Sequence, residues 1–322
     1  MTAKKTYFLW ALFASGLAAL IVASLLIGAA SLTSTSIADG VVLMVSRIPR
    51  TIAALLAGAG LAVAGVVIQQ AVQNRLVEPG LTGTSEAAML GLLLITLISP
   101  ATALILKMFV GAGAALIGTL LFFLLARYLP KIDPLLLPLV GLIYSGILGA
   151  AAIWVAWNTE LMQFLGVWAF GDFSGVLRGR YELLWLIAAL VVLLYFIADR
   201  ITVLGLGEDY ARSLGLNYGQ TLSLGLIFVA LTVSVVVVTV GALPFVGLVV
   251  PNIISRLLGD NLRQNLPVIA LTGSAFVLGS DVLGRLVRHP YEIPAATIFS
   301  ILGAIIFLWL LYKPVKQSHQ HG

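Results

Sequence analysis

The stretch from Arg47 to Gly83 constrains the fold of this chain more than any other. It opens with two arginines around Pro49 and then carries no charged residue from Thr51 to Asn74. An uncharged apolar run of this length fits a helix that crosses a membrane. Small residues recur along it and would let a neighbouring helix approach closely: Gly58, Gly60, Ala64 and Gly65.

Composition extends this expectation to the whole chain. Its 322 residues are 61% hydrophobic and 10% charged, whereas soluble domains carry about 25% charged residues. Its mean hydropathy is +1.10, and its apolar runs exceed the short alternating segments of a transmembrane barrel. The chain contains no cysteine, which excludes disulfides and thiolate metal sites. We therefore expect an all-α polytopic membrane protein, with residues 1–322 forming a single transmembrane domain.

The apolar runs predict about ten transmembrane helices. Eleven of the 18 Lys and Arg residues then fall on the side that holds both chain ends, which places both termini in the cytoplasm. The first run lacks a convincing cleavage site, so we expect it to be retained as a span. Two longer connections stand out, an outer segment over about 158–182 and a cytoplasmic segment over about 201–220. The expected spans are 7–30, 47–73, 80–98, 101–126, 135–157, 183–198, 221–241, 245–258, 267–284 and 293–312.

The sequence offers little for catalysis. It contains no G-x-x-x-x-G-K-[ST] phosphate-binding loop, no His/Asp/Glu cluster with metal-ligand spacing and no candidate triad. We therefore expect no enzyme activity, no catalytic residue, no cofactor and no metal site. The net charge of +5 is read as a membrane-orientation signal rather than as a sign of nucleic-acid binding.

An ion-coupled secondary transporter of a small solute is an alternative interpretation. Such carriers usually place ionisable groups within the membrane, and the candidates here are Glu86 and Asp281. Asp281 lies four residues before Arg285, which fits a helix-end ion pair. Glu86 lies near the start of a span, where a carboxylate suits the helix dipole. A structural role is favoured for both.

Two charged regions suggest partners. Residues 208–214 can form a short helix that Gly215 ends with positive φ, and such a helix could dock on a cytoplasmic protein; the alternative is a solvated loop. On the outer side, six arginines lie against the positive-inside trend: Arg47, Arg50, Arg178, Arg180, Arg285 and Arg288. They suggest an acidic partner protein or the phosphates of membrane lipid.

Four ordered motifs carry a family resemblance. They are similar to the hallmark motifs of the FecCD-type permeases, the membrane subunits of binding-protein-dependent ABC importers for ferric siderophores, haem and cobalamin. The matching stretches are R-I-P-R-T-I-A-A-L-L-A-G-A-G-L-A-V-A-G with N-R-L-V-E-P-G-L-T-G (47–83), L-G-E-D-Y-A-R-S-L-G-L (206–216), F-V-G-L-V-V-P-N-I-I-S-R (245–256), and D-V-L-G-R with E-I-P (281–294).

The resemblance implies a type II ABC importer permease fold in the bacterial cytoplasmic (inner) membrane. It implies two cytoplasmic ATP-binding subunits, a second permease that is identical or different, and an extracytoplasmic substrate-binding protein. By position, it assigns binding-protein docking to Arg47, Arg50 and Arg285. It assigns coupling to the ATPase to Gly207, Glu208, Asp209, Ala211, Arg212, Leu214 and Gly215. A cytoplasmic gate falls near Asp133, Pro134 and Leu135, and structural roles fall to Gly58, Gly65, Pro79, Gly83, Gly247, Pro251 and Asp281.

Departures from the common motifs bear on the substrate. Residues 74–79 read N-R-L-V-E-P where the family usually has N-P-L-A-x-P, and residues 251–252 read P-N where it has P-H. Together with F-S-G-V-L-R-G-R-Y-E-L-L (173–184), these forms resemble the subgroup that imports ferric catecholate siderophores. Haem and cobalamin remain alternative substrates.

Overall fold

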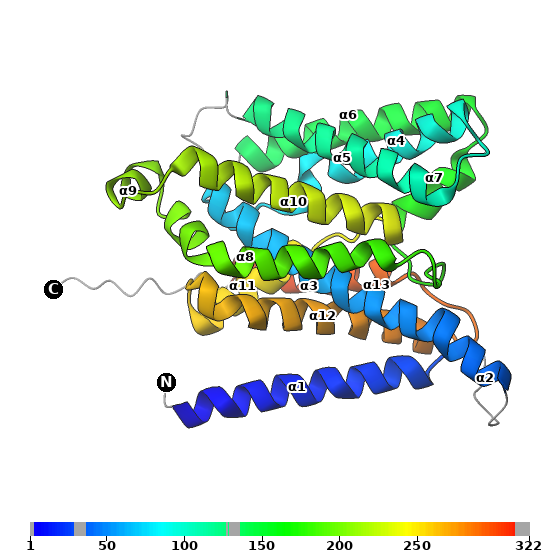
Figure 1. The fold of residues 1–322 in the computed structure, drawn as a ribbon, viewed down its shortest axis with the longest axis horizontal. Coiled ribbons are helices and arrows are strands. Elements are labelled where there is room, and N and C mark those ends of the chain that lie inside the picture. The colour runs from blue at the N-terminus through cyan, green and yellow to red at the C-terminus, as the bar shows by residue number, and fades with distance from the viewer. Residues whose placement is uncertain (1–2, 29–36, 127, 129–135, 313–322) are drawn as a thin grey trace.

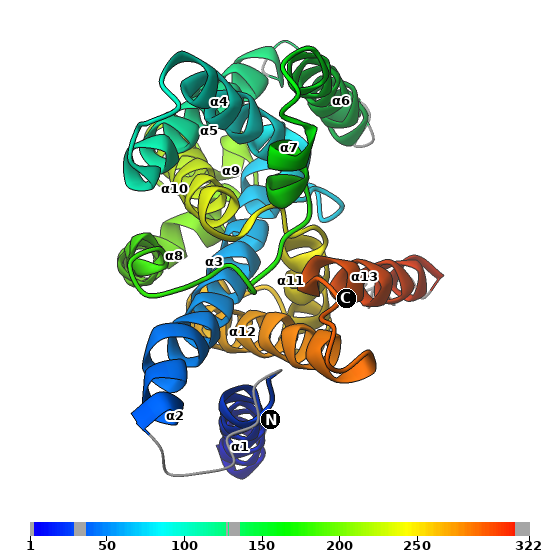
Figure 2. The ribbon, with the colours of Figure 1, turned by 90° about the vertical axis from the view of Figure 1, so that its right-hand side faces the viewer.

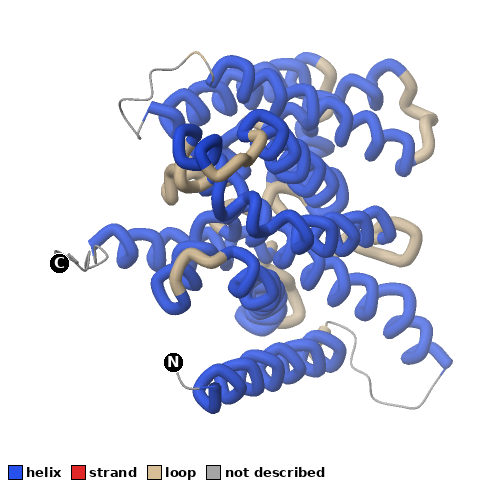
Figure 3. Tube along the Cα trace, turned by 60° about the vertical axis from the view of Figure 1, so that its left-hand side comes forward, coloured by secondary structure: helices blue, strands red, loops and turns tan. Residues whose placement is uncertain are grey.

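The computed structural model describes residues 3–28, 37–126, 128 and 136–312. In these ranges the chain consists of helices and loops only (Figure 3). Ten helices have 13 or more residues, which confirms the all-helical fold with about ten spans. They are α1 (Ala3–Leu26), α3 (Ile48–Val72), α4 (Thr84–Ile98), α5 (Leu104–Ala126), α6 (Leu136–Asn158), α8 (Trp185–Leu204), α10 (Tyr218–Val240), α11 (Val246–Leu258), α12 (Leu262–Val287) and α13 (Ala295–Tyr312).

Shorter helices lie at the two ends of the bundle. Figure 1 shows α9 (Glu208–Ser213) at one end, which we call the α9 end, and α2 (Ile37–Val42) with α7 (Met162–Ala169) at the other, the α7 end. α1 begins at the α9 end. α13 finishes there too, because Arg256 near the end of α11 donates a hydrogen bond to the carbonyl of Leu310. The remaining short elements are η1 (Leu43–Arg47), η2 (Pro79–Thr82) and η3 (Glu182–Leu184).

α3 forms the centre of the bundle. It packs against α12, α10, α11 and α8, and Figure 2 shows it running through the middle of the molecule. It continues the helical stretch that begins at Gly40, so the apolar run seen in the sequence becomes a single 33-residue helix. Its alanines are fully buried, which lets four helices surround it closely: Ala53, Ala54, Ala57, Ala62 and Ala64.

Two backbone contacts explain why α3 needs glycine. A Cβ added to Gly58 would lie 2.3 Å from the carbonyl oxygen of Gly273 on α12. A Cβ added to Gly65 would lie 1.9 Å from the carbonyl oxygen of Gly247 on α11. Both distances are far below van der Waals contact, so any side chain at these positions pushes two helices apart.

This geometry predicts opposite outcomes for two Gly→Ala variants. Gly65→Ala is expected to lower the free energy of unfolding by about 1–3 kcal/mol, because overpacking forces the backbones of α3 and α11 apart. Gly113→Ala on α5 is the control, since no atom lies within 4 Å of its added Cβ. That variant should raise stability by up to about 1 kcal/mol through helix propensity. Thermal unfolding of both purified variants checks this, and equal stabilities would contradict the packing.

α4 and α11 begin inside the bundle rather than at its ends. They have 15 and 13 residues, or about 20 Å at 1.5 Å per residue, which is short of the roughly 30 Å hydrocarbon core. The remaining depth is covered by segment 73–83, which is non-helical apart from the short η2, and by the non-helical segment 241–245. Segment 73–83 lies against the start of α11, where Pro79 packs on Gly247. The Gln69 side chain, in the last turn of α3, donates to the carbonyl of Gly247 at 3.1 Å. Non-helical backbone is tolerated at this depth because protein buries it.

Two helices extend beyond the spans expected from the sequence. The sixth span was expected to end at Ala198, but α8 continues through Asp199 to Leu204. The ninth was expected to begin at Pro267, but α12 begins at Leu262. Asp199 and Arg263 form an exposed ion pair across these two extensions. The charges therefore pair on the surface of α8 and α12 instead of ending the helices.

Candidate functional site

The α7 end contains a buried cluster of four charged side chains from α3, α12 and the loop after α12. Arg50 Nη2 lies 2.6 Å from Asp281 Oδ1, and Arg50 Nη1 lies 2.7 Å from Glu292 Oε2. Arg285 Nη2 lies 2.7 Å from Asp281 Oδ2. Asp281 is only 1% exposed and sits between the two guanidinium groups. The predicted Asp281–Arg285 ion pair is therefore present, and Arg50 joins it to α3.

Arg285 of this cluster and the neighbouring Arg47 also hold the end of α1. Arg47 Nη1 donates to the carbonyl oxygens of Leu25 and Leu26 at 2.7 and 2.9 Å. Arg285 Nη1 donates to the carbonyl oxygen of Ser24 at 2.9 Å, and its Nη2 donates to the Ser24 hydroxyl. The last carbonyls of a helix lack partners within the helix, so cationic donors at this point satisfy them and complement the dipole. The cluster thus joins α1, α3 and α12.

All three predicted docking arginines are buried in the structure. Arg47, Arg50 and Arg285 are 5%, 8% and 4% exposed. Docking of a binding protein at these arginines stays a prediction. No local pattern marks Ser24 for this cluster, and the E-I-P motif is the sequence signal for Glu292.

At the α9 end, the predicted short helix forms α9. Gly207 precedes it with φ of +103°, and Gly215 follows it with φ of +79°. The amide of Leu216 donates to the carbonyl of Ala211 at 2.9 Å, the bond expected where a glycine in left-handed conformation closes a helix. Glycine at Gly215 avoids the strain that a side chain would add.

Within the described part of the chain, no element covers the apolar face of α9. Tyr210 and Leu214, one turn apart, are 70% and 67% exposed, whereas Ala211 is fully buried against the bundle. On its polar side, Arg212 Nη2 lies 2.6 Å from Glu208 Oε1, and Asp209 lies in the first turn. The helix is therefore anchored at one residue and presents exposed aromatic and aliphatic side chains beyond the bundle.

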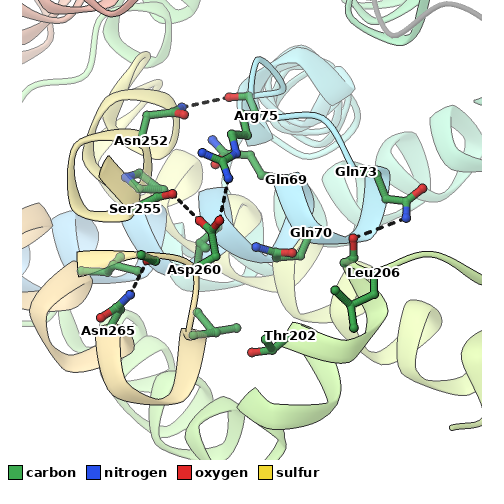
Figure 4. A pocket seen from close by; sticks show the side chains of 16 residues that line it. Gln69, Gln70, Gln73, Arg75, Thr202, Leu206, Asn252, Ser255, Asp260 and Asn265 are labelled. Atoms are coloured by element: carbon green, nitrogen blue, oxygen red, sulfur yellow. Dashed lines mark hydrogen bonds and ion pairs between the residues drawn. The ribbon is translucent and has the colours of Figure 1, made fainter. Parts of the chain in front are cut away.

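A polar cavity of about 230 Å³ lies beside α9, between the ends of α3, α8, α11 and α12 (Figure 4). Arg75 Nη2 lies 2.6 Å from Asp260 Oδ2, and Asn252 donates to the carbonyl of Arg75 at 2.9 Å. Gln73 donates to the carbonyl of Gly205, on the connection to α9, at 3.4 Å. The cavity thus connects the end of α3 to the base of α9. The feature of the sequence that corresponds to this cavity is the polar cluster from Gln69 to Arg75.

The remaining predicted residues fall in several places. Gly83 caps α4 with φ of +70°, and Pro251 lies within α11 and lines the polar cavity. Glu86 lies in the first turn of α4 as predicted, and its Oε2 is buried without a hydrogen-bond partner. The predicted gate residues Asp133, Pro134 and Leu135 lie outside the described residues. Across the described part of the chain, no group of three His, Asp or Glu side chains is placed to hold a metal.

The fold is that of a permease subunit of a type II ABC importer. The solved structure of a metal-chelate type ABC transporter in an inward-facing conformation matches it with a TM-score of 0.79, at 26% identity, over 94% of this chain and 97% of that one. The chain belongs to the FecCD transport family, whose model matches residues 12–313.

Two relatives show how similar the sequence is to siderophore permeases. The ferric-anguibactin transport system permease protein FatD of Vibrio anguillarum is 40% identical over 274 residues, which cover 85% of this chain and 87% of the relative. The petrobactin import system permease protein YclN of Bacillus subtilis is 41% identical over 271 residues, 84% of this chain and 86% of the relative.

Family membership defines the class of the protein. It is a multi-pass membrane protein of a bacterial ABC importer, in the family that serves siderophores and vitamin B12. FecCD permeases are transmembrane subunits without ATPase activity, so a separate subunit hydrolyses ATP. An importer of this type works with ATPase and binding-protein partners. This replaces the ion-coupled carrier interpretation.

Proposed function

We propose that this chain is the permease of an ATP-driven importer that carries a ferric siderophore, of the catecholate class, across the cytoplasmic membrane. The observation that carries the proposal is the sequence identity of 40% and 41%, over most of the chain, to permeases named for ferric-anguibactin and petrobactin. The N-R-L-V-E-P form of residues 74–79 agrees with it. In this arrangement the α9 end and both termini face the cytoplasm.

α9 is the proposed contact with the ATPase. Its exposed Tyr210 and Leu214 give an apolar anchor of the kind that fills a pocket in a partner. Its base touches the end of the central helix through Gln73 and the carbonyl of Gly205. A movement of the ATPase at α9 would therefore reach the end of α3 through the short connection at Gly205.

The α7 end is the proposed contact with the binding protein. The cluster there pairs Arg50 and Arg285 with the carboxylates of Asp281 and Glu292, and Arg47 lies beside it at the end of α1. These arginines are the proposed contacts of an acidic partner surface, and such attraction acts mainly on the association rate and weakens with salt. Unchanged binding-protein affinity across a salt series would contradict this assignment.

We propose that two such permeases and two ATPases complete the importer. Supporting this, α6 and α13 expose apolar side chains along most of their length, available to a second permease or to lipid: Ile143, Ile147 and Trp154 on α6, and Ile301, Ile305 and Leu308 on α13. The second permease is a copy of this chain or a related one.

Substrate class is tested by binding and uptake together. The partner binding protein is titrated with a ferric catecholate, a ferric hydroxamate, haem and cobalamin, and uptake of each is measured in vesicles that hold the complete importer. We expect tight binding and uptake of the catecholate only. Preference for haem or cobalamin in both assays would assign the chain to one of those substrates instead.

A further inference from the structure

A second cavity, of about 540 Å³, lies at the α7 end, between α7, the loop after it, the end of α10 and the residue before α13. Figure 2 looks onto this end and shows the loop after α7 passing the start of α13, where the Ala296 amide donates to the carbonyl of Gly171 at 3.1 Å. Aromatic and charged side chains line the cavity together: Trp168, Phe170, Asp172 and Arg180. None of them belongs to the buried arginine cluster described above.

Arg180 is the unusual member of this cavity. Its guanidinium carbon lies 5.5 Å from the centre of the Trp168 ring, so the cation stacks on the aromatic face. Its Nε is buried and has no hydrogen-bond partner. Among the residues that the structure describes, its one acceptor is the carbonyl of Gly175, at 3.3 Å from Nη1. Burial lowers the pKa of Arg180 from its ordinary value, and guanidinium stays charged at neutral pH.

The carboxylate in the cavity does not neutralise Arg180. Asp172 accepts hydrogen bonds from the Ser174 amide at 3.0 Å and from the Ser174 hydroxyl, so both of its oxygens face its own loop. Among the described residues, no carboxylate lies within ion-pair distance of Arg180. Burying part of a cation whose N–H donors lack acceptors costs free energy, and a ligand that accepts hydrogen bonds from those donors would remove this cost. The cavity therefore provides a positive charge flanked by the aromatic surfaces of Trp168 and Phe170.

We propose that this cavity is a subsite for an aromatic anion, in which Arg180 binds the oxygens of a catecholate group of the substrate. The ring would lie against Phe170, which is 63% exposed, while the guanidinium donates to the oxygens that also hold the iron. The inference rests on the proposed function, and it adds a residue of the permease to substrate selection. Its place at the α7 end, the proposed outer side, puts the subsite where a chelate leaves its binding protein.

The test is direct binding to the purified permease in lipid nanodiscs, with empty nanodiscs as background. The probes are a trianionic ferric tris-catecholate and a neutral ferric trihydroxamate, each labelled with radioactive iron. We expect Arg180→Gln to weaken catecholate binding by about 10- to 100-fold, as for loss of hydrogen bonds to a charged group, and to leave hydroxamate binding within about twofold. Arg180→Lys should lose less, because it keeps the charge but not the planar fork.

Arg178→Gln is the matched control, because Arg178 is an exposed arginine of the same loop that does not line the cavity. It should bind the catecholate as the unchanged protein does. Equal losses of catecholate affinity in both variants would show an effect of general surface charge and would overturn the subsite. Absence of catecholate binding by the unchanged permease would overturn it as well. Thermal unfolding of each variant separates misfolding from lost binding. If the complete importer takes up catecholate while Arg180→Gln binds normally, only the subsite fails; if it takes up no catecholate, the proposed function fails.

Discussion

Asp281→Asn is expected to lower the free energy of unfolding by about 3–5 kcal/mol, as for a buried ion pair that loses one partner. Asp281 is the carboxylate shared by Arg50 and Arg285, and all three side chains are buried. Asparagine keeps the shape of the side chain but removes the charge that offsets two guanidinium groups. Because Arg285 also holds the carbonyls at the end of α1, we expect the contact of α1 with α12 to weaken first.

The measurement is thermal and chemical unfolding of the purified variant in detergent, with Asp260→Asn as the matched control. Asp260 pairs with Arg75 at the same 2.6 Å distance, but the two side chains are 53% and 52% exposed. Solvent screens such a pair, so its loss should cost less than about 1 kcal/mol. Similar losses of unfolding free energy in the two variants would show that burial of the cluster at the α7 end does not determine how much the cluster contributes to stability.

The double variant Tyr210→Asp with Leu214→Asp is expected to abolish ATP-driven uptake while the permease stays folded. These side chains are exposed in the chain, so the substitutions remove no packing within the permease. In a partner pocket, however, they would bury two unpaired charges. Loss of a buried anchor costs about 2 kcal/mol or more at an interface, or roughly a 30-fold loss of affinity for the ATPase.

Two readouts check this variant: co-purification of the ATPase, and stimulation of its activity by loaded binding protein. Both should fall at least tenfold, while the unfolding temperature of the permease stays the same. Ser213→Ala on the same helix is the control, since it alters an exposed position between the two apolar ones and leaves the apolar face intact. Normal uptake by the double variant would mean that the ATPase docks elsewhere.

Much of the architecture followed from hydrophobic runs and glycine positions. The uncharged run after Arg50 became the central helix, and Gly58 and Gly65 lie where α12 and α11 touch it. The short helix before Gly215 also formed as expected. Its ends lie at glycines with positive φ, and glycine is visible in the sequence.

Other features depended on contacts between distant residues. Asp199 was expected to end a span, but its pairing with Arg263 keeps it on the surface of a longer helix. Likewise, Arg50 and Glu292 lie 242 positions apart, so neither the burial of the arginines nor the carboxylate partners of Arg50 could be derived from a local pattern. The pairing of Arg285 with Asp281, four residues away, could be. The Arg180 cavity could not be derived from a local pattern either, because its lining comes from α7, the loop after α7, the end of α10 and the residue before α13.

Uptake by the reconstituted importer tests the central claim most directly. Vesicles containing this permease, its partner permease and the ATPase are supplied with binding protein loaded with a radiolabelled ferric catecholate. The account predicts uptake that requires both ATP and the binding protein and that continues when ion gradients are collapsed. Uptake driven by a proton or sodium gradient in the absence of ATP would contradict it.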